Sequence, residues 1–136
     1  MTSISDFERT PTVAKVSVAV KADALDPAEV TRVVDLLPTR AYRKGEISPN
    51  RSVPRPRGIW AIECRADNIE TATAELLAIV ETRMGQLREA ASKYDGAELT
   101  VGIFWQPEGG QGGYSLSSDV VQRLSKLGTR IDFYFC

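Results

Sequence analysis

The stretch that decides the fold is VAKVSVAVK, residues 13–21, in which two sets of side chains alternate. Successive side chains of a β-strand point to opposite faces of the sheet. One set is entirely apolar, and the other contains both lysines and a serine. The pattern predicts a strand with one buried face, formed by Ala14, Val16, Val18 and Val20, and one mixed face, formed by Lys15, Ser17, Ala19 and Lys21.

The residues that follow this strand predict a helix. In LDPAEVTRVVDLLP, residues 25–38, Asp26 is a good N-cap and Pro27 suits the first helical position. Pro38 ends the helix, because the residue before a proline is pushed out of the α region. The side chains expected on the buried face of the helix are Val30, Val33, Val34 and Leu37.

The remaining elements are expected from similar patterns. A long helix is predicted from Asp67 or Asn68 to about residue 92, and a shorter one from Ser117 or Ser118 to Gly128. Strands are predicted around 39–45, 58–65, 99–106, 114–117 and 130–136. The core is expected to contain the aromatic side chains of Trp60, Trp105, Phe133 and Phe135.

The order of these elements is β-α-β-β-α-β-β-α-β, and its first six match a ferredoxin-like unit. The predicted fold class is therefore α/β, of the α+β type, with a largely antiparallel sheet and three helices on one face. A chain of 136 residues is expected to form one domain, here residues 12–136, after a loose tail at 1–11.

The face of the sheet without helices is one candidate site. It is mixed in character, with charged, aromatic and aliphatic side chains, and an exposed apolar patch often marks an interface. Three readings stay open: a homodimer interface, a small-ligand site, or a face covered by the tail or a loop. The candidate residues are Ile59, Glu63, Arg65, Phe104, Asp132 and Tyr134.

A basic segment is the second candidate. Residues 38–58, PTRAYRKGEISPNRSVPRPRG, hold six of the seventeen Lys and Arg residues and one acid, Glu46. The segment is interpreted as a solvated loop that balances the acidic remainder, as a docking surface for an acidic protein, or as a nucleic-acid contact. A net charge of −1 makes nucleic acid the least favoured partner. The candidate residues are Arg40, Arg43, Lys44, Arg51, Arg55 and Arg57.

Several chemistries have no support in the sequence. The chain contains no histidine, which excludes Ser-His-Asp and Cys-His catalysis and metal sites built on imidazole. Cys64 and Cys136 match no ligand spacing and are expected to be inert thiols. GGQGG, residues 109–113, is interpreted as a hairpin loop rather than a phosphate loop. No metal site, cofactor or membrane segment is predicted, and a cytoplasmic location is expected.

At the level of motifs, the chain resembles the bacterial domain of unknown function family 4279. The most specific match is LLPT at the end of the first helix, followed five residues later by Lys44-Gly45. LSSDVVQRLSKLG, residues 116–128, with the strand after it, supports the resemblance. The resemblance implies a small bacterial single-domain protein and supplies no catalytic residues.

The functional prediction is a non-catalytic protein-binding or interaction module. Its partner is expected to be a second copy of the chain or an acidic protein, and an immunity-type or regulatory protein is one concrete version. The alternatives are a weak nucleic-acid or anion binder that uses residues 40–57, and an enzyme with carboxylate, lysine or tyrosine chemistry. The enzyme requires a pocket in the sheet face that holds two or more of Glu63, Arg65, Asp132 and Tyr134.

Overall fold

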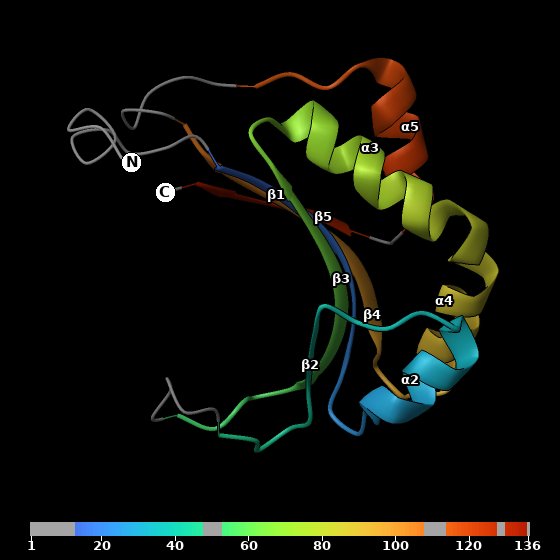
Figure 1. Ribbon diagram of the computed structural model, residues 1–136. Coiled ribbons are helices and arrows are strands. Elements are labelled where there is room, and N and C mark those ends of the chain that lie inside the picture. The colour runs from blue at the N-terminus through green and yellow to red at the C-terminus, as the bar shows by residue number, and fades with distance from the viewer. Residues whose placement is uncertain (1–12, 48–52, 108–113, 128–129, 136) are drawn as a thin grey trace.

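The strands form one curved sheet. The computed structural model describes residues 13–47, 53–107, 114–127 and 130–135, with the side chain of Phe135 left aside (Figure 1). Within these residues, five strands are arranged in the order β2-β3-β1-β4-β5. Their bounds are Val13–Ala22 for β1, Arg40–Tyr42 for β2, Gly58–Ala66 for β3, Glu98–Gln106 for β4 and Arg130–Phe135 for β5.

The pairing of the strands confirms the predicted fold class. β1 lies at the centre and is antiparallel to β3 and to β4, and β2 is antiparallel to β3. The first four strands thus have the ferredoxin-like arrangement, in which each βαβ crossover encloses an antiparallel strand. β5 is parallel to β4, as expected for two strands connected through a helix.

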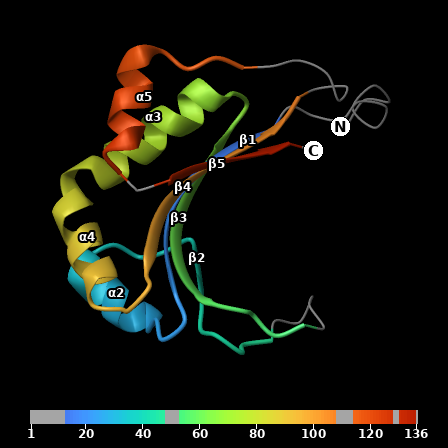
Figure 2. The same cartoon turned by 180° about the vertical axis from the view of Figure 1, so that it is seen from behind.

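The helices gather on the convex side of the sheet, and the concave side carries none of the described helices (Figures 1 and 2). α2 spans Pro27–Val34, α3 spans Ile69–Val80, α4 spans Met84–Ser92 and α5 spans Ser118–Ser125. The side chains of Asp26, Asn68 and Ser117 accept hydrogen bonds from backbone N–H groups at the starts of α2, α3 and α5. These caps satisfy N–H groups that have no partner within the helix.

The core lies between the helices and the convex face of the sheet. All four residues predicted on the buried face of residues 13–21 are fully buried, and so is Trp60. The indole Nε1 of Trp60 donates a hydrogen bond of 3.0 Å to Thr31 Oγ1 of α2, which satisfies the only polar atom of this large side chain. Trp60 therefore joins β3 to α2 by both packing and a hydrogen bond.

The predicted long helix is interrupted. A turn of 3₁₀-helix, Glu81–Arg83, separates α3 from α4. Figure 1 shows that the two helices follow the curve of the sheet, which a single straight helix could not do. α3 packs on β1 and β3, whereas α4 packs on β1, β4 and α2. Glu81, which lies in the turn between α3 and α4, forms an ion pair with Arg123 of α5. This ion pair links α5 to the α3–α4 segment.

Three further details of the sequence prediction were wrong. α2 ends at Val34, where Asp35 adopts the left-handed conformation (φ 60°), so Leu37 lies beyond the helix and is exposed. Residues 114–117 form no strand, because β5 occupies the edge of β4; instead Tyr114 packs edge-on against Trp105. Phe133 is 51% exposed, since β5 is the edge strand of the described sheet and offers neighbours on one side only.

A pair of glycine substitutions tests this packing. A Cβ on Gly58 would lie 2.8 Å from the backbone oxygen of Ala22 and 2.9 Å from Leu25 Cβ, whereas a Cβ on Gly85 would meet nothing within 4 Å. We expect Gly58→Ala to lower the free energy of unfolding by about 1–3 kcal/mol, as overpacking does. Gly85→Ala, the matched control in α4, should raise it by about 0.5–1 kcal/mol. Urea denaturation measures both, and equal effects would contradict the packing around Gly58.

Candidate functional site

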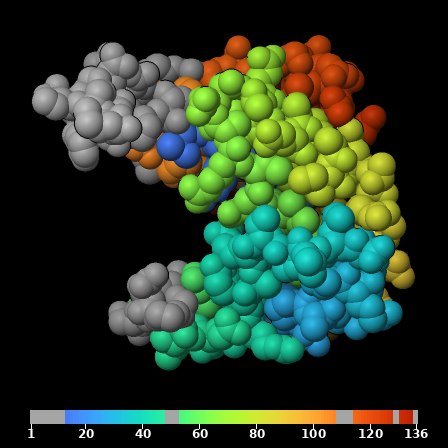
Figure 3. Space-filling model, in the orientation of Figure 1, coloured from blue at the N-terminus to red at the C-terminus, as the bar shows by residue number. Residues whose placement is uncertain are grey.

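The concave face of the sheet carries a cavity. Lysines 15 and 21 of β1 project from this face, and the register places Phe104 and Arg65 on either side of Lys15. In the next row, Ser17 lies between Glu63 of β3 and Gly102 of β4. The space-filling view shows the molecule hollowed on this side (Figure 3). We call the cavity in this face of the sheet the basin.

The basin has a floor of small residues and a rim of charged and aromatic ones. Its volume is about 370 Å³. The floor is formed by Ser17, Ala19, Thr100 and Gly102. Because these side chains are short, the longer ones around them stand above the floor and enclose a space. The rim consists of Lys15, Lys21, Arg40, Glu63, Phe104, Asp132 and Tyr134.

One side of the basin holds an ion pair with unsatisfied atoms. Arg40 Nη2 lies 3.2 Å from Glu63 Oε1, and Lys15 Nζ lies 4.0 Å from the same oxygen. Among the described residues, neither Glu63 Oε1 nor Arg40 Nε has a hydrogen-bond partner, although both atoms are buried. A buried polar atom without a partner costs about 1–3 kcal/mol, and more when it is charged. The pair is therefore able to gain hydrogen bonds from a bound molecule.

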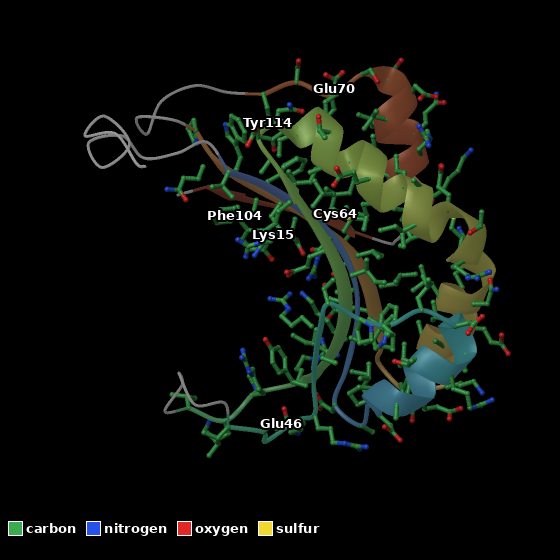
Figure 4. The ribbon with its side chains drawn as sticks, in the orientation of Figure 1. Lys15, Glu46, Cys64, Glu70, Phe104 and Tyr114 are labelled. Carbon is green, nitrogen blue, oxygen red and sulfur yellow. The ribbon has the colours of Figure 1, made fainter. Side chains whose placement is uncertain are left out.

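The other side of the basin is aromatic. Phe104 of β4 lies opposite Tyr134 of β5, and the ammonium group of Lys15 lies 5.2 Å from the centre of the Phe104 ring. Figure 4 shows Lys15 and Phe104 together on the concave side, whereas Cys64 lies toward the helices. Asp132 is next to this aromatic pair and is held by Arg130, whose Nε is 3.1 Å from its Oδ1.

The structure brings four of the six predicted sheet-face residues into the basin. Glu63, Phe104, Asp132 and Tyr134 line it, whereas Ile59 and Arg65 lie on the same face outside it. Arg40 joins them from the predicted basic segment. The prediction did not propose Lys15, Ser17, Ala19, Lys21, Thr100 or Gly102 as site residues. The alternation of residues 13–21 placed the first four on the correct face, and only the strand register brings them beside Glu63 and Phe104.

The other described basic residues of the segment contact groups of the same chain. Arg43 contacts Asp26 at 2.8 Å, and Lys44 contacts Asp23 at 3.6 Å. Arg55 lies over the ring of Tyr42, with its guanidinium carbon 3.7 Å from the ring centre. These contacts favour the interpretation of the segment as a balance for acidic residues of the same chain, and its role as a docking surface stays a prediction. Arg51 and the GGQGG loop lie outside the described residues.

Arg57 is the most firmly held of these cations. Its Nη1 donates a hydrogen bond of 2.7 Å to Glu98 Oε1, and its Nη2 donates to the backbone oxygens of Lys21 and Gly96. Arg130 reaches the other oxygen of Glu98 at 3.1 Å. This cluster links the end of the basic segment to β4 and β5 beside the basin.

The two acidic groups of the basin come from different strands and have different cations beside them. The register places Glu63 and Asp132 in one row with β1 and β4 between their strands. Three strand spacings separate their Cα atoms by about 14 Å. Each carboxylate is also drawn toward its own cation, Arg40 for Glu63 and Arg130 for Asp132.

The described residues also bear on metal and thiol chemistry. In the described part of the chain, no group of three or more Cys, Asp or Glu side chains is placed to hold a metal ion. Cys64 is buried, and this burial raises the pKa of its thiol, so the reactive thiolate is disfavoured. This agrees with the prediction of an inert thiol at Cys64, whereas Cys136 lies outside the described residues.

A second cavity, of about 450 Å³, lies between α4, α5 and the turn before β4. It is more open than the basin, and its lining combines two cations with mostly small or apolar residues. Arg88, one of these cations, already donates a hydrogen bond of 2.6 Å to the backbone oxygen of Lys126. The basin is therefore the stronger candidate, because it combines cations, carboxylates and aromatic rings around a small-residue floor.

Comparison with known proteins adds the family. The chain belongs to the family described as "Domain of unknown function (DUF4279)", whose model matches residues 12–135. This confirms the resemblance inferred from the LLPT and Lys44-Gly45 motifs. Neither the curated proteins nor the solved structures contain a significant match to the chain. No helix in residues 13–47, 53–107, 114–127 and 130–135 is long and apolar enough to cross a bilayer.

The cluster beside the basin gives a pH prediction. The hydrogen bond from Arg57, with a further contribution from Arg130, lowers the pKa of Glu98 below its ordinary value. The stabilisation from this contact is present above the pKa of the unfolded carboxyl and is lost as the pH falls through the folded pKa. We expect Arg57→Gln to raise the pKa of Glu98 in a carboxyl-detected NMR titration. Arg88→Gln, whose partner is a backbone oxygen, is the control, and an unchanged Glu98 pKa in Arg57→Gln would contradict the contact.

Proposed function

We propose that this chain is a non-catalytic binding domain and that its basin receives a small molecule. The observation that carries the proposal is the basin itself, a cavity of about 370 Å³ that combines a small-residue floor with cations, carboxylates and two aromatic rings. Pockets of about 300–1,000 Å³ with a few convergent polar groups are typical of small-ligand sites. The unsatisfied atoms of Arg40 and Glu63 supply polar groups that a ligand would complete.

The enzyme alternative has one observation in its favour. The pocket that it required exists, since Glu63, Asp132 and Tyr134 all line the basin. Against it stands the placement of Glu63 and Asp132 on strands three spacings apart, with about 14 Å between their Cα atoms. Each carboxylate also has a cation as its neighbour, Arg40 beside Glu63 and Arg130 beside Asp132. These features support binding of charged groups more than acid–base chemistry.

The shape of the face also bears on its partner. Interfaces that bury a sheet face need complementary surfaces. A concave face meets its own copy poorly, because two hollows brought together leave a void, whereas a small molecule or a convex surface fits. The geometry therefore supports a ligand over a homodimer formed face to face. A protein partner of immunity-type or regulatory kind, a bacterial source and a cytoplasmic location stay predictions from the sequence.

Filling the basin tests this proposal. We expect the low-molecular-weight extract of the host cells to shift the backbone amide NMR signals of Lys15–Lys21 and Gly102 in the unmodified protein. Ala19→Trp places a large side chain on the basin floor, and we expect it to abolish these shifts. The measurement is a series of ¹H–¹⁵N spectra with increasing extract.

The matched control is Ala78→Trp, which makes the same change at an exposed position of α3 on the opposite side of the sheet. It should respond to the extract like the unmodified protein. The proposal is wrong if no basin amide responds, if the shifts lie elsewhere, or if Ala19→Trp and Ala78→Trp respond equally.

A further inference from the structure

The basin also indicates what kind of molecule it binds. We infer that the ligand is a small molecule with a planar apolar body and an acidic head group that also carries a hydrogen-bond donor. An amino acid with an aromatic side chain has this chemistry. This inference rests on the proposed function and names its ligand class.

The head group is assigned to the pair of Arg40 and Glu63. Arg40 Nε lacks an acceptor and Glu63 Oε1 lacks a donor among the described residues. Arg40 Nη2 and Glu63 Oε1 lie 3.2 Å apart but do not have the geometry of a hydrogen bond. A rotation of the guanidinium and carboxylate groups would therefore open both to a ligand. An acidic oxygen would satisfy the guanidinium, and an ammonium or amide N–H would satisfy the carboxylate.

The apolar body is assigned to the other end. Phe104 and Tyr134 stand side by side on β4 and β5, and Tyr134 is 50% exposed. The Tyr134 ring lies over Gly102, since a Cβ on Gly102 would lie 3.7 Å from Tyr134 Cε2 and 2.9 Å from Ser17 Oγ. A flat ring of a ligand would gain stacked or edge-on contact with the half-exposed Tyr134.

The distance between the two ends limits the length of the ligand. Arg40 on β2 and Phe104 on β4 are separated by three inter-strand spacings and by four residues along the strand direction. Ordinary sheet dimensions put these Cα atoms about 19 Å apart. The two ends are much closer at their side chains, since Lys15 Nζ lies 4.0 Å from Glu63 Oε1 and 5.2 Å from the centre of the Phe104 ring, so a molecule that touches both ends is short.

The charges that line the basin favour this ligand class over other anions. Three cations, Lys15, Lys21 and Arg40, line the basin with two carboxylates, Glu63 and Asp132. The excess of one positive charge favours a single acidic group. A molecule with several phosphates would meet repulsion from both carboxylates, and a simple amine would meet the cations.

Four matched probes test the assignment: phenylalanine, 3-phenylpropionate, 2-phenylethylamine and alanine. Phenylalanine carries the ring with both the acid and the amine. 3-Phenylpropionate carries the ring and the acid, 2-phenylethylamine carries the ring and the amine, and alanine carries the acid and the amine without the ring. We expect phenylalanine to bind most tightly by NMR titration of the basin amides. Removal of the acid should weaken binding by about tenfold or more, as loss of a charge-assisted hydrogen bond does. Alanine should give no saturable shift.

Two variants assign the head groups to their partners. Arg40→Gln should remove the preference for 3-phenylpropionate over 2-phenylethylamine. Glu63→Gln should remove the preference for phenylalanine over 3-phenylpropionate and leave binding of 3-phenylpropionate in place. Because each variant is judged by a ratio of affinities within one protein, a general loss of stability does not produce the expected result.

The outcomes separate this inference from the proposed function. If 2-phenylethylamine binds best, or if none of the four probes shifts the basin amides while the host extract does, the ligand class is wrong and the binding domain stands. If the extract also leaves these amides unchanged, both are wrong. If either variant leaves its affinity ratio unchanged, the assignment of that head group is overturned.

Discussion

The central position of β1 is the constraint on which the rest of the structure depends. Its backbone pairs on one edge with β3 and on the other with β4 along almost its whole length. The two periodic faces of this one strand therefore set the register of the whole sheet. Its buried face fixes the core against α3 and α4. A shift of one residue would bury Lys15 and Lys21, which is why this register is strongly specified.

The same strand also creates the basin. Its outward face places two lysines at the ends and two small residues, Ser17 and Ala19, between them. β4 continues the low floor with Thr100 and Gly102, whereas β3 and β5 contribute larger charged and aromatic side chains. The curve of the sheet toward this side, visible in Figures 1 and 2, raises the neighbouring strands around the centre. A hollow follows from side-chain size and sheet curvature together.

Local signals in the sequence were sufficient for most of the fold. Asp26 and Pro27 marked the start of α2, and the alternation of residues 13–21 gave the correct buried face. The site was only half predictable, because it depends on register. Glu63, Phe104, Asp132 and Tyr134 were placed on the open face from alternation alone. Nothing local to Gly102 or Lys15 reports which residues of other strands lie beside them, and that information is present only after the strands pair.

Arg40 shows how the two predicted sites meet. The sequence groups it with the other cations of residues 38–58, because they are neighbours along the chain. In the structure, Arg43, Lys44 and Arg57 are held by Asp26, Asp23 and Glu98, all of which lie near the ends of strands. Arg40 belongs to β2 itself, and β2 pairs with β3, so its side chain reaches Glu63 in the basin. The acidic contacts hold the segment against the sheet and so position Arg40, which gives the basic segment a structural part in the proposed binding site.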